Sequence, residues 1–355
     1  MLNPYYIHSS LFKFRNKFTA VRFLFGFCII IFFQSCAATL PEFEKMNGVS
    51  FVAARDSITE KHVAPLVSIN ANYAAIMPFG FVRDDKSPKV IHDSERQWFG
   101  ETLGGTKQYI EELQRQHIKI MLKPQLWYWH GKFTGTLEMT NEEDWKILEE
   151  TYKGFILSYA KLAEQLKVEL LCIGTELEKF VVNREDYWKN LINEIRLVYN
   201  GKLTYAANWD EYKRTPFWDD LDFIGIDAYF PVSEMETPTV EDCLEGWEDH
   251  IGGIKKLMNT YEIPVLFTEY GYRSTNFTGK EPWDANYDKG VVNLEAQKNA
   301  MEALFKTFWN QPWFAGGFIW KWFHYHDRVG GNENHMFTPQ NKPVEEVIKD
   351  YYLGY

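Results

Sequence analysis

The sequence predicts a single-domain α/β fold, a (β/α)8 TIM barrel, over residues 49–355. Short apolar runs alternate with amphipathic helical segments, an alternation typical of parallel strands joined by crossover helices. Eight such runs lie within roughly 300 residues, which suits a closed barrel better than an open sheet. No G-x-G-x-x-G follows the first run and no P-loop is present, so a doubly wound nucleotide-binding fold is disfavoured.

The strand candidates are short apolar runs bounded by turn-forming or charged residues, as in strands buried on both faces. The seventh shows the pattern clearly, because an apolar segment lies between a proline and the glycine of PVLFTEYGY. In chain order, the candidates are Val49–Ala54, Tyr73–Met77, Ile118–Leu122, Glu169–Ile173, Lys202–Ala207, Asp222–Ile226, Pro264–Thr268 and Gly316–Trp320.

The helix candidates carry apolar residues at helical spacing. In the third, for example, Leu191, Ile192 and Ile195 form one stripe. No Pro- or Ser-rich linker separates any of them, so we expect one domain. The helix candidates are Leu103–Gln116, Asp144–Leu166, Glu185–Tyr199, Val240–Tyr261, Leu294–Trp309 and Val344–Tyr352.

The N-terminus reads as an export signal. A basic segment, Lys13–Arg22, precedes an apolar run, Phe23–Phe33, that is too short to span a bilayer as a helix. The following Ser35-Cys36 resembles the lipobox of bacterial lipoproteins, which implies cleavage before Cys36 and lipidation of its thiol. We therefore expect a signal peptide over 1–35, a tether over 36–48 and a membrane-anchored lipoprotein at the cell surface or in the periplasm of a bacterium. Ordinary secretion and a retained anchor are the alternatives.

Charge and cysteine content exclude several function classes. The formal net charge is −11, so the chain lacks the basic surface that nucleic acid requires, and we expect no nucleic-acid partner. Only Cys172 and Cys243 lie in the body of the chain, after the leader and the tether, so there is neither a disulfide framework nor a C-x-x-C metal pattern. Cys172 lies in an apolar run and is expected to pack as a small hydrophobe.

Two glutamates follow strand candidates, where the active sites of such barrels lie. Glu176 follows the fourth run and Glu269 the seventh, on what we expect to be opposite sides of the ring. Paired carboxylates cleave glycosidic bonds, one as acid and the other as nucleophile or base, at separations of about 5–5.5 Å in retaining and 6.5–9.5 Å in inverting enzymes. Each raises the cost of ionising the other, which keeps one protonated. A structural salt bridge is the alternative for either glutamate alone.

Other polar and aromatic residues follow the remaining strands. Lys123 is expected to bind sugar hydroxyls or to form an ion pair inside the barrel mouth, and Asp227 to bind a hydroxyl or to tie down a loop. Glu178 is read as a first-turn helix charge rather than as a rival acid. The full set of expected substrate-binding residues is Lys123, Gln125, Trp127, Asn208, Trp209, Asp227, Tyr229 and Trp320.

Six segments resemble glycoside hydrolase family 113, and together they cover nearly the whole body of the chain. They are KPQLW (Lys123–Trp127), IGTELEKF (Ile173–Phe180), FIGIDAYFP (Phe223–Pro231), FTEYGY (Phe267–Tyr272), GGFIWKW (Gly316–Trp322) and FTPQNKPVEEVI (Phe337–Ile348). The resemblance implies a retaining endo-β-1,4-mannanase that acts on mannan-type polysaccharides and uses no metal or organic cofactor.

The resemblance also implies roles for individual residues. Glu176 would be the general acid/base and Glu269 the nucleophile. Tyr229 would hydrogen-bond the nucleophile, and Trp320 would form a platform under the sugar at the −1 subsite. The family's clan usually places asparagine before the acid/base to bind the sugar 2-hydroxyl, but Thr175 stands there, and Asn208 is a candidate to supply that contact.

Two alternatives stay open. The same scaffold suits an exo-β-mannosidase or a hydrolase of glucan or xylan. From another class, a non-catalytic glycan-binding lipoprotein would keep the barrel but not the chemistry, and the presence of both glutamates argues against it.

Overall fold

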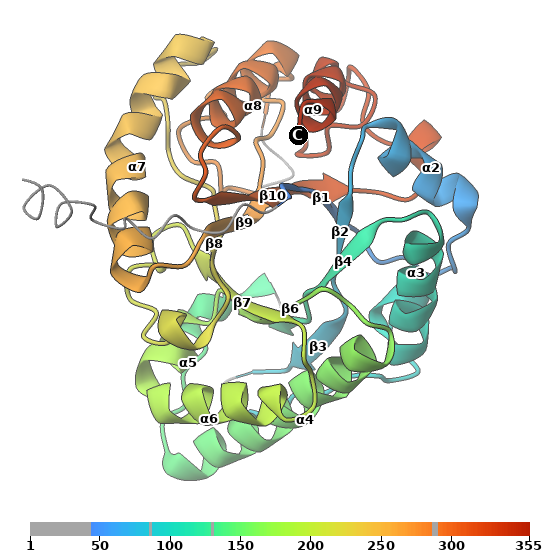
Figure 1. Cartoon of the computed structure of the whole chain (residues 1–355), viewed down its shortest axis with the longest axis vertical. Coiled ribbons are helices and arrows are strands. Elements are labelled where there is room, and N and C mark those ends of the chain that lie inside the picture. The colour runs from blue at the N-terminus through green and yellow to red at the C-terminus, as the bar shows by residue number, and fades with distance from the viewer. Residues whose placement is uncertain (1–43, 85–86, 129–130, 286–289) are drawn as a thin grey trace, which may run out of the picture. The chain divides into compact units, whose positions relative to one another are not determined.

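The computed structural model describes residues 44–84, 87–128, 131–285 and 290–355, which lie within one compact unit, Glu42–Tyr355. Eight parallel strands close into a barrel surrounded by helices, which confirms the predicted (β/α)8 fold (Figure 1). Around the ring the order is β1-β10-β9-β8-β7-β6-β4-β2. The barrel strands are β1 (Met46–Phe51), β2 (Tyr73–Ile76), β4 (Lys119–Leu122), β6 (Leu170–Thr175), β7 (Lys202–Asn208), β8 (Phe223–Asp227), β9 (Val265–Tyr270) and β10 (Phe314–Trp322).

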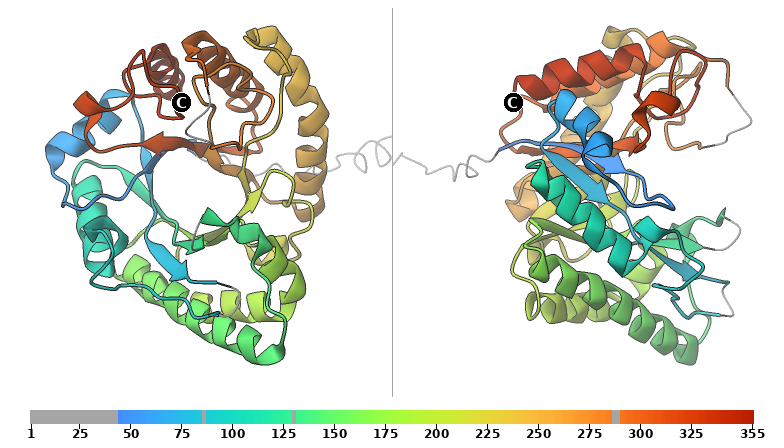
Figure 2. Two further views of the ribbon diagram at one scale, coloured as in Figure 1. Left: turned by 180° about the vertical axis from the view of Figure 1, so that it is seen from behind. Right: turned by 90° about the vertical axis from the view of Figure 1, so that its right-hand side faces the viewer.

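The helices lie outside the ring of strands, as the view from behind in Figure 2 also shows. All six predicted helices are present, and their bounds differ from the predictions by a few residues at most. The long helices are α3 (Leu103–Arg115), α4 (Glu142–Gln165), α6 (Glu185–Arg196), α7 (Val240–Tyr261), α8 (Leu294–Phe308) and α9 (Pro343–Leu353).

Several elements were not predicted. Helix α2 (Glu60–Ser68) contains Pro65, which usually argues against a helix interior. Strands β3 (Phe79–Val82) and β5 (Gln125–Tyr128) form a separate two-stranded parallel sheet. Each has four residues, too few for a clear alternation. The other short elements are α5 (Glu178–Asn183), η1 (Phe99–Glu101), η3 (Thr134–Thr136), η4 (Trp218–Asp220) and η5 (His326–Arg328).

The first strand begins earlier than predicted. It runs from Met46 to Phe51, so residues 46–48, which the sequence analysis assigned to the tether, belong to the barrel. Gly48 explains the difference, because a glycine disfavours a strand by composition. A Cβ at this position would lie 2.4 Å from the Phe318 ring, so the ring requires a glycine. The early start reflects packing inside the barrel rather than local preference.

The barrel interior is a packed core. Side chains from alternate positions of the strands fill it, among them Met121, Cys172 and Phe318. Cys172 is fully buried, as expected for a small hydrophobe, and burial raises the pKa of its thiol to about 12. This core closes the barrel below the mouth, so ligands have access only at the ends of the strands.

Candidate active site

Glu269 lies near the end of β9 and is held by three donors. The Tyr229 hydroxyl donates to its Oε2 at 2.8 Å, while Gln125 Nε2 and Lys123 Nζ donate to its Oε1 at 3.0 and 2.5 Å. The residue is only 6% exposed. Three donors on its two oxygens give this carboxyl group a fixed orientation.

A β-bulge directs Glu269 into the mouth. The register between β8 and β9 shifts so that Ile226 pairs with Phe267, but Asp227 pairs with Glu269. Thr268 and Glu269 are adjacent, and yet both bond to groups in the mouth, since Thr268 Oγ1 donates to Asp227 Oδ1 at 2.7 Å. Regular alternation would direct one of the two away from the mouth. The bulge therefore turns the carboxyl group of Glu269, one of the two glutamates that the sequence analysis singled out, toward the mouth of the barrel.

Lys123 and Asp227 are buried behind Glu269 rather than exposed to a ligand. Both side chains are 0% exposed, and Lys123 Nζ lies 3.2 Å from Asp227 Oδ1. Burial lowers the pKa of Lys123, but the carboxylates of Asp227 and Glu269 outweigh it and raise that pKa above its usual value. Lys123 therefore forms the ion pair that was the alternative to a sugar contact, and the Asp227 carboxylate bonds Lys123 and Thr268 of β9 rather than a loop.

Glu176 follows β6 at a strained backbone position. Its φ is +49°, in the left-handed region that non-glycine residues seldom adopt. Its N–H donates to the Ala206 carbonyl of β7 at 2.8 Å, which fixes the turn. The sequence analysis expected the two glutamates on opposite sides of the ring. In the structure β7 and β8 lie between β6 and β9, so the glutamates are three strands apart rather than diametrically opposed.

The environment of Glu176 differs from that of Glu269. Glu176 is partly exposed to the cleft, and no donor bonds its carboxyl within the described part of the chain. Burial raises the pKa of Glu176 well above its usual value, the carboxylates of Asp227 and Glu269 raise it further, and Lys123 opposes them. One carboxyl is thus held by three donors, and the other has the raised pKa that a general acid requires.

Two cavities meet at this pair of glutamates. One, of about 590 Å³, extends over the ends of β1, β2, β4 and β5 and is lined by Gln125 and Trp127. The other, of about 510 Å³, extends over the ends of β7 and β8 and is lined by Asn208, Trp209 and Tyr229. Both are also lined by Glu176, Glu269, Trp320 and Phe133. Shared walls indicate one cleft that continues on both sides of the carboxyl pair.

Aromatic rings line this cleft. Trp320 lines both cavities, and Trp127 is 49% exposed in the first. Trp209 stacks on Trp283, with centroids 4.9 Å apart and planes at 17°, in the second. The sequence analysis missed Trp283 because it considered only residues directly after strands, whereas Trp283 lies in the long loop between β9 and α8. Flat apolar faces suit the C–H faces of sugar rings.

Thr175 and Asn208, the two residues considered for contact with the sugar 2-hydroxyl, lie in different environments. Thr175 Oγ1 is buried from solvent, although the residue touches the first cavity. Asn208 lines the second cavity, and its Oδ1 accepts from the Trp209 N–H at 2.7 Å. Glu178 begins α5 and pairs with Arg214, whose Nε lies 2.6 Å from its Oε1, which fits a helix charge rather than an acid in the cleft.

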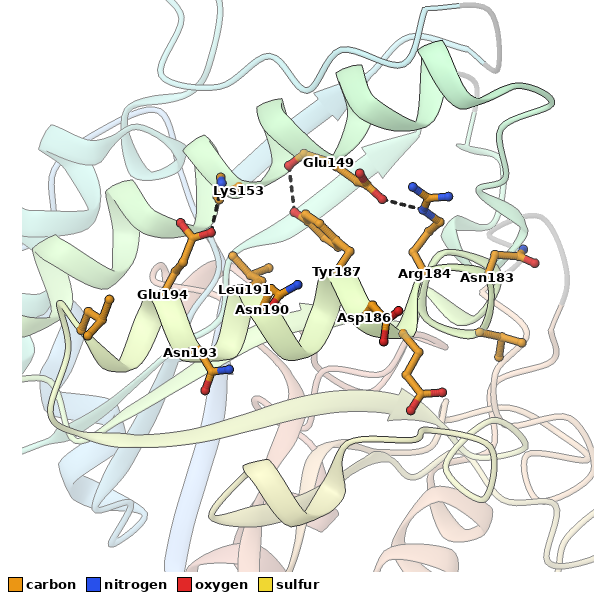
Figure 3. Close-up of a pocket in the computed structure, with 13 residues that line it drawn as sticks. Glu149, Lys153, Asn183, Arg184, Asp186, Tyr187, Asn190, Leu191, Asn193 and Glu194 are labelled. Atoms are coloured by element: carbon orange, nitrogen blue, oxygen red, sulfur yellow. Dashed lines mark hydrogen bonds and ion pairs between the residues drawn. The ribbon is translucent and has the colours of Figure 1, made fainter.

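A larger groove lies on the outer helical layer, away from the strand ends. It has a volume of about 850 Å³ and lies along α4 and α6. Figure 3 shows two ion pairs among its side chains: Arg184 Nε lies 2.5 Å from Glu149 Oε1, and Lys153 Nζ lies 3.0 Å from Glu194 Oε1. It contains none of the predicted site residues, so it is not the candidate active site.

Other possible sites are limited. Within the described residues, no group of three or more His, Cys, Asp or Glu side chains is placed to hold a metal ion. None of the helices in this part of the chain combines the length and apolar character needed to cross a bilayer. Cys36, the predicted lipidation site, lies outside the residues that the structure describes.

Comparisons with known proteins agree with this fold. The model of glycoside hydrolase family 113 matches residues 52–342. A GH113 β-mannanase from Alicyclobacillus acidocaldarius superposes with a TM-score of 0.76 and 22% identity, covering 88% of this chain and 98% of that one. A GH113 β-1,4-mannanase gives the same TM-score and identity, covering 88% and 100%.

More distant structures share the fold. A β-glucuronidase from Faecalibacterium prausnitzii superposes with a TM-score of 0.57 and 15% identity, covering 88% of this chain but 49% of that one. No curated protein matches the chain.

Proposed function

The chain belongs to glycoside hydrolase family 113, and on that premise we propose that it is a retaining endo-β-1,4-mannanase. One observation carries the proposal: two carboxyl groups share one cleft, one oriented by three hydrogen-bond donors and the other with a raised pKa. This is the division of roles that double displacement requires. The fold and the family support glycoside hydrolysis, and the manno-specificity rests on the resemblance to the family.

Glu269 acts as the nucleophile in this mechanism. Its carboxylate forms a bond to the anomeric carbon while the bond from that carbon to the leaving oxygen breaks. The three donors orient the carboxylate before the attack. Tyr229 lines the second cavity, and burial raises the pKa of its hydroxyl well above the usual value, so it remains a neutral donor.

Glu176 acts as the general acid and then as the base. It protonates the leaving oxygen in the first step and takes a proton from water when the glycosyl-enzyme is hydrolysed. Its raised pKa keeps it protonated before the first step. After that step Glu269 is esterified and uncharged, so one of the negative charges that favour the protonated form of Glu176 is lost.

Lys123 and Asp227 act as positioning residues. Lys123 bonds both Asp227 and Glu269. Its ammonium group therefore fixes the nucleophile through a buried ion pair and partly neutralises the charge of the Glu269 carboxylate. Gln125, at 8% exposed, supports Glu269 from the side of β5. Trp320, Trp127 and Trp209 are the proposed stacking faces for sugars, and the Asn208 amide is the proposed contact for the 2-hydroxyl.

The shape of the cleft supports internal rather than terminal cleavage. Cavities continue on both sides of the carboxyl pair, each with an aromatic wall, so a glycan can extend past the reacting bond in both directions. An exo-enzyme requires a closed end at this place. The Trp209–Trp283 stack widens the aromatic wall on the side of β7 and β8.

The decisive test compares two glutamate variants with azide as an added nucleophile. On an activated aryl β-mannobioside, Glu269→Ala with azide should give the α-azide, because azide attacks from the face that the carboxylate has left. Glu176→Ala should give the β-azide, because azide attacks the glycosyl-enzyme from the opposite face. Each variant should lose about 100-fold or more activity on unactivated substrate.

Glu178→Gln is the matched control, since Glu178 lies two residues from Glu176 and should leave activity within about threefold. Wild-type activity in Glu269→Ala would overturn the nucleophile assignment. A product profile on mannan, glucomannan, cellulose and xylan tests specificity: mixed internal fragments of mannan support the proposal, whereas release of mannose alone favours an exo-β-mannosidase. A wild-type protein that binds mannan without cleaving it would support the glycan-binding alternative.

Export and lipid anchoring are also proposed, on the sequence alone. The lipobox-like Ser35-Cys36 after an apolar run supports a lipid anchor on Cys36. An anchored enzyme outside the cytoplasm would meet polysaccharide that cannot enter the cell.

A further inference from the structure

A buried hydrogen-bonded chain lies directly behind Glu176. Tyr205 is in β7, and Glu211 lies in the loop that follows it. The Tyr205 hydroxyl accepts from the Leu177 N–H at 2.7 Å and donates to Glu211 Oε1, also at 2.7 Å. Leu177 is the residue after Glu176. The chain therefore ends on the backbone that carries the proposed acid/base.

Tight packing holds the two residues of this hydrogen-bonded chain, Tyr205 and Glu211, and burying the Glu211 carboxyl costs free energy. Tyr205 is 0% exposed, and its ring packs against Trp188 and Phe217, with centroids 5.7 and 5.6 Å away. Glu211 is 2% exposed, and no cation pairs with it among the residues that the structure describes. A buried carboxylate is costly unless hydrogen-bonded, and here the second oxygen accepts from the Asn208 N–H at 3.1 Å.

The hydrogen bonds of Tyr205 and Glu211 hold the backbone next to Glu176, which is a strained residue. With a φ of +49°, Glu176 stays in its turn only if its surroundings hold it there. Its own N–H is bound by Ala206, and the next N–H is bound by Tyr205. Both restraints come from β7. Loss of the second would free the peptide that sets the direction of the Glu176 side chain.

We propose that Glu211, acting through the Tyr205 hydroxyl, is a positioning residue for the general acid/base Glu176. The inference rests on the proposed function. Burial raises the pKa of Glu211 to about 8, so its link to Glu176 is the sequence of hydrogen bonds through Tyr205 and Leu177 rather than a fixed charge. Neither residue touches substrate, since both are buried behind the strand ends.

Leaving-group dependence separates positioning of the acid from general damage to the fold. Tyr205→Phe keeps the ring and removes only the hydroxyl. We expect kcat/KM on a β-mannan oligosaccharide to fall by about 10-fold or more, because departure of a sugar alkoxide needs the acid. On the dinitrophenyl glycoside of the same glycone, kcat/KM should stay within about threefold, because that leaving group needs no proton. Azide should raise kcat of Tyr205→Phe on the dinitrophenyl substrate, since azide needs no base.

Tyr199→Phe is the matched control. Tyr199 is 1% exposed, and its hydroxyl donates to the Val168 carbonyl at 2.9 Å, just before β6 and β7 begin. The control variant therefore removes a similar buried hydrogen bond at the other end of these strands. It should affect both substrates equally. Glu211→Gln should show the same leaving-group pattern as Tyr205→Phe, and the double variant should lose no more than the worse single variant, because the two act in series.

The outcomes are distinct. Equal losses on both substrates in Tyr205→Phe, or additive losses in the double variant, overturn the inference and leave the proposed function standing. Wild-type protein inactive on both substrates contradicts the proposed function and the inference together.

Discussion

At the scale of single residues, the chemistry depends on three carboxyl groups in different environments. Glu269 is bound by three donors, Glu176 is raised in pKa by burial, and Asp227 is paired with Lys123. Burial and the neighbouring Glu269 raise the pKa of Asp227 to about 7, against the influence of Lys123. The set works as a unit, so a change in one should be visible in the titration of another.

The first residue-scale prediction concerns pH. Asp227→Asn keeps the one oxygen, Oδ1, that accepts from both Lys123 and Thr268 but removes a negative charge that raises the pKa of Glu176. The acid must be protonated, so activity falls as pH rises through that pKa. We expect the alkaline limb of kcat/KM to move to lower pH, by about one unit or less. Asp222→Asn is the control, because Asp222 pairs with Arg196 and Lys202 before β8. An unmoved limb would count against the assigned role.

The second residue-scale prediction concerns the sugar 2-hydroxyl. Asn208 lines the second cavity, whereas the hydroxyl of Thr175 is buried. Asn208→Ala should therefore lower kcat/KM on the substrate by about 3–10-fold, the value of one neutral hydrogen bond. Thr175→Val should change it by less than about threefold. The reverse order, measured in parallel assays, would assign the contact to Thr175.

At the scale of elements, irregularities at the strand ends determine where the side chains of the candidate active site lie. Register shifts between β6 and β7 and between β8 and β9 occur just before Glu176 and Glu269. The end of β10 approaches the end of β9 closely: a Cβ at Gly271 would lie 2.7 Å from the Trp320 carbonyl oxygen. The glycine of PVLFTEYGY therefore makes room for the backbone that presents Trp320.

The element-scale prediction uses two glycines. Gly271→Ala should lower the free energy of unfolding by about 1–3 kcal/mol and reduce activity further by displacing Trp320. Gly252→Ala, inside α7, should raise it by about 0.5–1 kcal/mol, because an added Cβ meets no atom within 4 Å. Chemical denaturation and kcat/KM measured on both variants test this; a neutral Gly271→Ala would show that β9 and β10 adjust freely.

At the scale of the whole molecule, the described body is one barrel whose ring of strand ends carries the cleft, and the proposed export signal and lipid anchor belong to residues 1–36. The acidic charge of the chain suits an uncharged substrate. Family membership covers residues 52–342, which leaves the leader outside the family match. The leader's role is therefore testable separately from the catalytic site.

The whole-molecule prediction concerns Cys36. In a bacterial host, the full-length chain should sediment with membranes, dissolve in detergent and incorporate labelled palmitate. Cys36→Ser should incorporate none, because the serine hydroxyl cannot take the thioether-linked lipid. Cys28→Ser, within the apolar run, is the control and should still be labelled. Equal labelling of Cys36→Ser and the full-length chain would exclude Cys36 as the lipidation site.

The sequence alone determined the barrel, because hydrophobic periodicity and strand count are local properties that accumulate along the chain. It also determined that Glu176 and Glu269 lie at the ends of strands, since that requires only their positions. It did not determine that Lys123 and Asp227 are buried partners, nor that Trp283 stacks on Trp209, because these contacts join residues far apart in the chain. Bulges and a left-handed turn, which only tertiary packing stabilises, decided where the two carboxyl groups point.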